Sequence, residues 1–183
     1  MTAGDGGGTI GEVEIRPART GDAPALALVH VRSWQGAYRG LLPQEFLDGL
    51  DPAQRAGFWE RVLAAAGARS GVVVADAGES LAGFAGFGPA RDEDADPGQT
   101  GELWAIYLHP DAWGQGWGRQ LMAAAVTGMA DAGFSQAVLW VLDSNERARR
   151  FYQAAGWSPD GAAKGDTIGG AQVTEVRYRR SLR

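Results

Sequence analysis

The sequence has no cysteine among its 183 residues and only two histidines. The lack of cysteine excludes disulfides, thiolate metal sites and a cysteine nucleophile, and it suits a reducing compartment. No apolar run approaches the ~20 residues that cross a bilayer. The first residues have neither the basic region nor the apolar region of a signal peptide. We therefore expect a cytoplasmic protein without a membrane span.

The chain also has no strong excess of positive charge. The net charge is −5, so we expect neither a nucleic-acid partner nor a membrane partner. The acidic stretch at 91–97 is expected to be a solvated loop. His30 and His109 have no evident third ligand nearby in the sequence, and we expect no metal site.

Hydrophobic patterning predicts a glycine-rich flexible tail over residues 1–11 and one domain over 12–183. Thr20 is expected to cap the first helix, Asp51 the second, and Gly156 to end the last. Residues 70–76 and 80–89 are expected to pair as a hairpin. The fold class that follows is mixed α/β. The expected strands are 13–18, 70–76, 80–89, 101–110, 137–143 and 171–182, and the expected helices are 20–40, 51–66, 115–132 and 145–155.

Three glycines, Gly114, Gly116 and Gly118, alternate between the strand 101–110 and the helix that follows it. The first N–H groups of a helix have no intrahelical acceptor and attract anions, above all phosphate. Glycine removes the Cβ atoms that would keep a phosphate away, and Arg119 adds positive charge. The spacing matches neither the Walker loop nor G-x-G-x-x-G. A plain turn is the alternative, but the flanking strand and helix favour a phosphate-binding loop.

A second motif lies downstream, in "LWVLDSNERARRFYQAAGW". Together, "WGQGWG" at 113–118 and the set Asn145, Ala148, Phe151, Tyr152, Gly156 and Trp157 resemble the two motifs of the GNAT superfamily of acyl-CoA-dependent N-acyltransferases. Trp113 departs from the Gln or Arg that the superfamily pattern has there, and its alternative role is to plug the strand end. The resemblance implies a mixed central sheet with helices on both faces, antiparallel N-terminal strands and a splayed parallel pair around the cofactor.

The resemblance implies transfer of an acetyl group from acetyl-CoA to a primary amine of a small molecule or peptide, by direct attack in a ternary complex. It also allows a homodimer. The cofactor-binding residues that it implies are Tyr107, Leu108, His109, Trp113, Gly114, Gln115, Gly116, Trp117, Gly118, Arg119, Asn145, Ala148 and Tyr152.

The same resemblance implies the catalytic residues. A primary amine is mostly protonated near neutral pH, so a base must take its proton. Glu102 stands where many superfamily members have a catalytic glutamate, and Glu175 and Asp143 are alternatives. Tyr152 is implied as the hydrogen-bond donor to the departing thiolate, and the Leu108 N–H is expected to stabilise the oxyanion.

Trp34, Tyr38, Glu102 and Trp104 are the expected substrate-binding residues, because aromatic rings suit a cationic amine. Two other functions compete. A non-catalytic acyl-CoA sensor with the same fold is one, and Glu102 and Tyr152 argue against it. A nucleotide-binding α/β protein is the other, and the failed nucleotide motifs argue against that.

Overall fold

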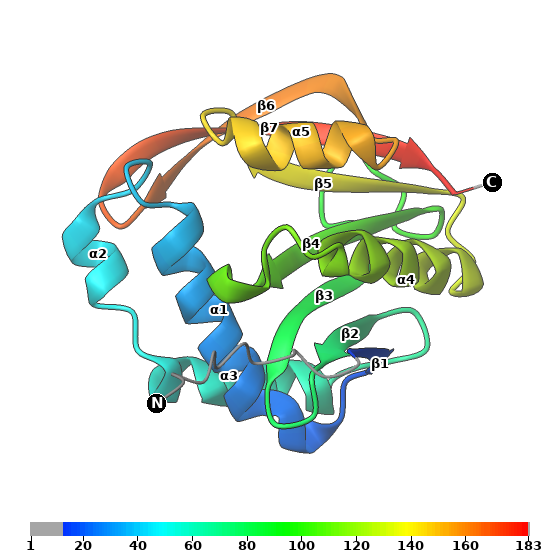
Figure 1. The fold of residues 1–183 in the computed structure, drawn as a ribbon. Coiled ribbons are helices and arrows are strands. Elements are labelled where there is room, and N and C mark those ends of the chain that lie inside the picture. Colours follow the sequence, from blue (N-terminus) through cyan, green and yellow to red (C-terminus); the bar gives the residue numbers. More distant parts are fainter. Residues whose placement is uncertain (1–12, 183) are drawn as a thin grey trace, which may run out of the picture.

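The computed structural model describes residues 13–182, so the predicted tail over 1–11 lies outside the described residues. The strands of this part of the chain form one sheet in the order β1-β2-β3-β4-β5-β7-β6 (Figure 1). Their bounds are β1 Glu14–Pro17, β2 Gly71–Asp76, β3 Leu81–Pro89, β4 Thr100–Leu108, β5 Gln136–Leu142, β6 Ser158–Ile168 and β7 Ala171–Ser181. The helices are α1 Ala23–Ala37, α2 Gln44–Asp48, α3 Pro52–Ala64, α4 Trp117–Asp131 and α5 Glu146–Ala154, with short 3₁₀ turns η1 Thr20–Asp22 and η2 Pro110–Ala112.

Local signals placed two helix ends correctly. The Asp51 side chain accepts a hydrogen bond from the Ala53 N–H at 2.8 Å, which caps α3 as predicted. Gly156 follows α5 with φ of 82°, the left-handed conformation that favours glycine at this position. The prediction for Thr20 is wrong, because this residue lies within the 3₁₀ turn η1 and α1 begins only at Ala23.

Two elements were not predicted. The strand β6 is almost wholly exposed and carries glycine, proline and aspartate, so it shows no apolar alternation. It forms because it pairs with β7, as in the register Lys164↔Glu175. The helix α2 has five residues and is too short to give a periodic signal. It packs at the turn between β6 and β7, where a Cβ on Gly169 would overlap the Phe46 ring.

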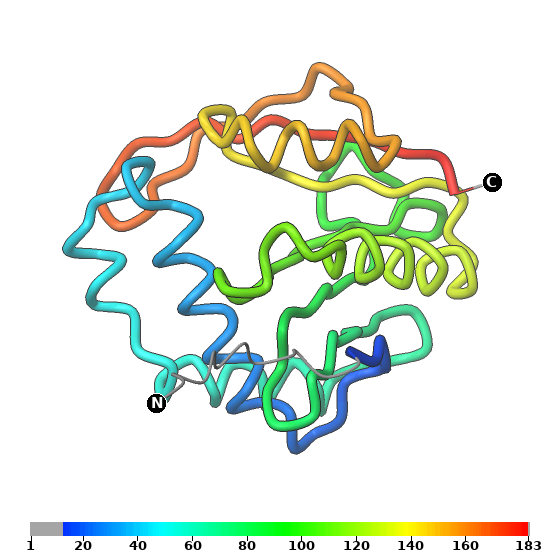
Figure 2. Tube along the Cα trace, viewed as in Figure 1, coloured from blue at the N-terminus to red at the C-terminus, as the bar shows by residue number. Residues whose placement is uncertain are grey.

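Helices cover both faces of the sheet (Figures 1 and 2). On one face α4 and α5 bury a core that includes Leu121, Met129 and Trp157. On the other face α1 and α3 bury a second core around Leu26 and Trp59. The predicted arrangement of a mixed sheet with two covered faces is therefore confirmed.

The sheet opens between β4 and β5. The two strands are parallel, but they pair only from Thr100↔Gln136 to Glu102↔Val138, although both continue well beyond. Figure 2 shows the two strands diverging. In addition, the β3–β4 register shifts near Gly86, and Trp104 is left without a partner residue on β3. The splayed parallel pair is thus confirmed, and it exposes the edge of β4.

Candidate active site

A cavity of about 620 Å³ lies in the opening between β4 and β5. On one side, here called the loop side, it is lined by the glycine loop and by α5. On the other, the hairpin side, it is lined by α1 and by the β6–β7 hairpin. The residues that were named from the sequence and that line the cavity are Trp34, Tyr38, Glu102, Trp104, Tyr107, Leu108, Trp113, Gly114, Gly116, Gly118, Arg119, Asn145, Ala148, Phe151, Tyr152 and Glu175.

The glycine loop brings bare backbone to the cavity. Gly114 and Gly116 have φ of 81° and 89°, and a Cβ on either would meet no atom within 4 Å. These glycines are therefore required by the backbone conformation, and space remains beside them. Gly118 lies in the first turn of α4, where a Cβ would come to 3.4 Å from the Phe151 ring of α5. The start of α4 thus lies against α5 beside the loop.

Three predicted cofactor-binding residues do not line the cavity: His109, Gln115 and Trp117. The Gln115 side chain donates to the Asp111 carbonyl at 3.0 Å and accepts from Trp117 Nε1 at 3.3 Å. His109 Nδ1 faces the Asp111 N–H at 3.4 Å. The side chains of His109 and Gln115 therefore brace the loop from within.

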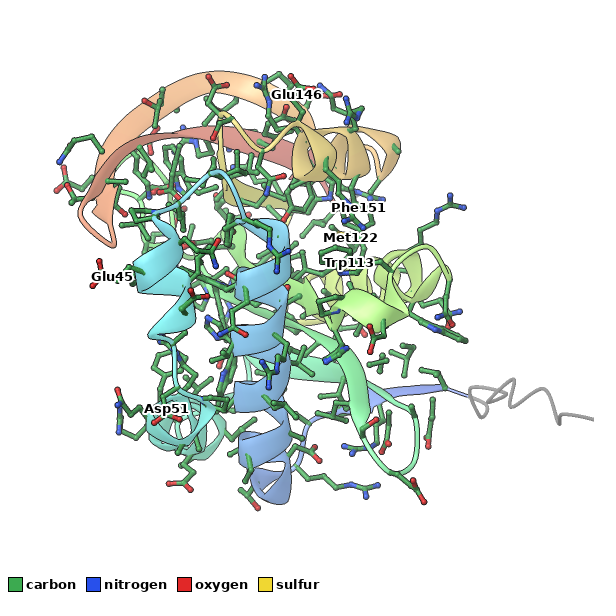
Figure 3. The ribbon with its side chains drawn as sticks, turned by 60° about the vertical axis from the view of Figure 1, so that its left-hand side comes forward. Glu45, Asp51, Trp113, Met122, Glu146 and Phe151 are labelled. Atoms are coloured by element: carbon green, nitrogen blue, oxygen red, sulfur yellow. The ribbon has the colours of Figure 1, made fainter. Side chains whose placement is uncertain are left out.

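Trp113 packs at the end of β4. Its Nε1 donates to the Leu108 carbonyl at 3.1 Å. A Cβ on Gly36 of α1 would come to 3.0 Å from the ring. The Arg147 guanidinium of α5 lies 3.9 Å from the ring centroid. Trp113 and Phe151, both labelled in Figure 3, lie in the region where the loop and α5 approach each other.

The start and face of α5 bring the second motif to the cavity. Asn145 caps the helix, with its side-chain oxygen accepting from the Ala148 N–H at 3.1 Å. Tyr152 lies one turn beyond Ala148 and packs against Phe151, at 5.5 Å between ring centroids. Burial, with a smaller effect from Tyr107, raises the pKa of Tyr152 well above its usual value of about 10. The Tyr152 hydroxyl therefore keeps its proton at neutral pH and can donate a hydrogen bond.

Aromatic side chains dominate the α1 wall. The Trp34 ring lies 5.0 Å from Tyr38 and 6.3 Å from Tyr107 between centroids. Burial raises the pKa of both tyrosines, and Glu175 acts on both in the same direction. Tyr38, Tyr107 and Glu175 all line the cavity. Trp104 adds a fourth ring, which packs over Gly86 of β3. A Cβ at Gly86 would overlap this ring, so only glycine leaves room for it.

Two ion pairs border the hairpin side. Arg91 donates to Glu102 from Nε at 2.9 Å, from Nη2 at 2.6 Å and from its backbone N–H at 3.2 Å. Lys164 Nζ lies 3.4 Å from Glu175. Asp166 also lines the cavity, and it joins no ion pair found within residues 13–182. The hairpin side therefore has an excess of negative charge. Asp143, an alternative base, pairs with Arg149 at 2.6 Å and does not line the cavity.

The acidic stretch at 91–97 is not wholly solvated, in contrast to the expectation. Arg177 of β7 binds Asp92 at 3.0 Å and Asp94 at 2.6 Å, which fixes the loop against the sheet. Other residues that line the cavity were not predicted, because β6 was not expected and the ion pairs join residues that are distant in sequence. They include Arg91, Trp140, Arg147, Lys164, Asp166 and Ile168.

Within residues 13–182, no group of three His, Cys, Asp or Glu side chains is placed to hold a metal ion. None of the helices in the same range is long and apolar enough to span a membrane.

Known proteins resemble this chain in sequence or in fold. The chain is 37% identical over 167 residues to the uncharacterized N-acetyltransferase YuaI of Bacillus subtilis, which covers 90% of each chain. The structure of the PaiA N-acetyltransferase of Thermoplasma acidophilum in complex with coenzyme A matches with a TM-score of 0.71 and 20% identity, over 93% of this chain and 99% of that one. The structure of YncA of Salmonella typhimurium with its cofactor acetyl-CoA matches with a TM-score of 0.71 and 20% identity, over 94% of this chain and 95% of that one.

The fold and the relatives define an acetyltransferase. The model of the acetyltransferase (GNAT) family matches residues 33–157, which include the glycine loop and the α5 motif. The chain belongs to the GNAT family.

Proposed function

We propose that this protein transfers an acetyl group from acetyl-CoA to a primary amine of a small molecule or peptide, by direct attack in a ternary complex. One observation carries the proposal. A single cavity joins a glycine loop with Arg119 beside it to an aromatic, acidic region, and it does so through the opening between β4 and β5. A phosphorylated donor and a cationic acceptor fit these two sides.

The donor fits the loop side. Diphosphate needs free N–H groups and no obstructing side chain. The loop leaves open space at Gly114 and Gly116, and the first N–H groups of α4 have no intrahelical acceptor. Beyond Glu102, β5 no longer pairs with β4, so this edge of β4 is open. Its backbone at Tyr107 and Leu108 can pair with the amide groups of pantetheine. Asn145 and Ala148 lie across the opening and line the same side. The solved structures of PaiA with coenzyme A and of YncA with acetyl-CoA have the same fold, and this likeness of fold supports the assignment.

The backbone of β4 also supports an oxyanion site. The His109 N–H donates to the Ala82 carbonyl of β3 at 2.8 Å. Successive residues of a strand alternate the direction of their N–H groups, so the Leu108 N–H points away from β3, toward the opening. Trp113 Nε1 already binds the Leu108 carbonyl on that side. The Leu108 N–H is therefore the donor that we assign to the negative oxygen formed during attack.

The acceptor amine lies on the hairpin side, among the rings of Trp34, Tyr38 and Trp104. Its ammonium form is attracted by the carboxylates there, and a base must then remove a proton. We assign the base to Glu102, which is 4% exposed and held in one orientation by Arg91. Tyr152 donates a hydrogen bond to the thiolate as CoA leaves.

The test is release of free thiol from acetyl-CoA with a panel of primary amines. Cationic amines should be acetylated, and an amine-dependent rate above background supports the proposal. A rise in melting temperature with acetyl-CoA, without turnover of any amine, would instead support the acyl-CoA sensor. Neither stabilisation nor turnover would contradict both functions.

A further inference from the structure

Arg147 is a cation in an unfavourable place, and it has no partner carboxylate within residues 13–182. It is the second residue of α5, where the helix dipole disfavours positive charge. Its neighbours on the helix behave differently: Arg149 pairs with Asp143 and Arg150 with Glu146. Arg147 belongs to none of the ion pairs found within the described residues. It lines the cavity instead, opposite the glycine loop.

The Trp113 ring holds Arg147 there. The guanidinium lies 3.9 Å from the ring centroid, which is a close cation–π contact. The ring itself is fixed on two sides, because Nε1 binds the Leu108 carbonyl and the ring edge meets Gly36 of α1. A guanidinium stacked by its face keeps its N–H donors free in its own plane, and this fork suits two oxygens of a phosphate.

We propose that Arg147 binds the diphosphate of the acyl-CoA donor and that Trp113 is its positioning residue. This inference rests on the proposed function. It explains why Trp113 stands where the superfamily pattern has Gln or Arg. The loop has no polar side chain at this position, and the Trp113 ring instead holds the Arg147 guanidinium of α5 beside the loop. With Arg119 from α4, the diphosphate is held by one arginine from each of two helices.

The experiment compares Arg147→Met with Arg150→Met, a control that removes an exposed arginine of the same helix. Calorimetry with CoA should show affinity weakened roughly 10- to 100-fold by Arg147→Met, as expected for lost charge-assisted hydrogen bonds. The control should stay within about twofold of wild type. The KM for S-acetyl-pantetheine, which has no diphosphate, should not change in Arg147→Met. Unchanged CoA affinity, or an equal loss with S-acetyl-pantetheine, would overturn the proposal.

Substitutions at 113 test the positioning role. Trp113→Leu should weaken CoA binding, whereas Trp113→Phe keeps a ring and should retain most of the affinity. In the double variant Trp113→Leu/Arg147→Met, the losses should not add, because both remove one interaction. Additive losses would show that Trp113 acts independently of Arg147, against the proposal.

Inorganic pyrophosphate separates this inference from the proposed function. If wild type binds pyrophosphate but not CoA, and Arg147→Met loses that binding, the diphosphate site stands and the donor assignment fails. If wild type binds CoA and Arg147→Met binds it equally well, the donor assignment stands and this inference fails. Failure of wild type to bind either ligand overturns both.

Discussion

Acid should destabilise this protein through His30, a residue of α1 that is only 8% exposed. Its ring lies 5.0 Å from Tyr107, 5.4 Å from Trp34 and 5.9 Å from Trp59 between centroids. Neither ring nitrogen has a hydrogen-bond partner within the described part of the chain. A positive charge would therefore be buried among rings without a carboxylate to balance it.

Burial lowers the pKa of His30 from 6.5 to about 3, and the charge of Arg55 contributes in the same direction. Between these values the unfolded chain binds a proton that the folded protein does not bind, so the free energy of unfolding falls as the pH falls. The loss is about 1.4 kcal/mol per pH unit, which gives about 2 kcal/mol at pH 5 and about 5 kcal/mol at pH 3. Above pH 6.5 this contribution to destabilisation vanishes.

Urea unfolding of wild type, His30→Met and His109→Gln at pH 7 and pH 5 tests the reasoning. His30→Met removes the titrating group at similar volume, and His109→Gln removes the other histidine of the chain. From pH 7 to pH 5, wild type should lose about 2 kcal/mol more stability than His30→Met. His109→Gln should follow wild type closely. Equal losses in wild type and His30→Met would refute the reasoning.

Tyr152→Phe should lower kcat roughly 10- to 100-fold by removing a hydrogen bond to the thiolate, and calorimetry should show nearly unchanged CoA affinity. A matching loss of affinity would contradict the role. Glu102→Gln should remove the acidic limb of the pH profile of kcat/KM, since a neutral amide accepts no proton; a profile like that of wild type would exclude Glu102 as base. Gly86→Ala should cost about 1–3 kcal/mol in urea unfolding, because its Cβ overlaps the Trp104 ring, and should raise the acceptor KM. Gly165→Ala, where a Cβ meets no atom within 4 Å, is the control, and equal costs would argue against the overlap.

The loop side was predictable because its signals are local. Glycines at 114 and 116 adopt positive φ within one turn, and Asn145 caps the helix that begins at the next residue. Such conformational requirements act over a few residues, so they leave a pattern in the sequence. The resemblance carried by these two segments implied the splayed sheet, which the fold confirms.

The hairpin side depended on the tertiary structure. Lys164 faces Glu175 only because β6 pairs with β7 in one register, and β6 has no apolar pattern of its own. Arg147 meets Trp113 only because α5 and the glycine loop lie across one opening in the sheet. The sequence by itself determined the conformation of the glycine loop and the family. Tertiary structure decided which charges face each other, because Coulombic and ring contacts depend on distance in space and leave no spacing in the chain.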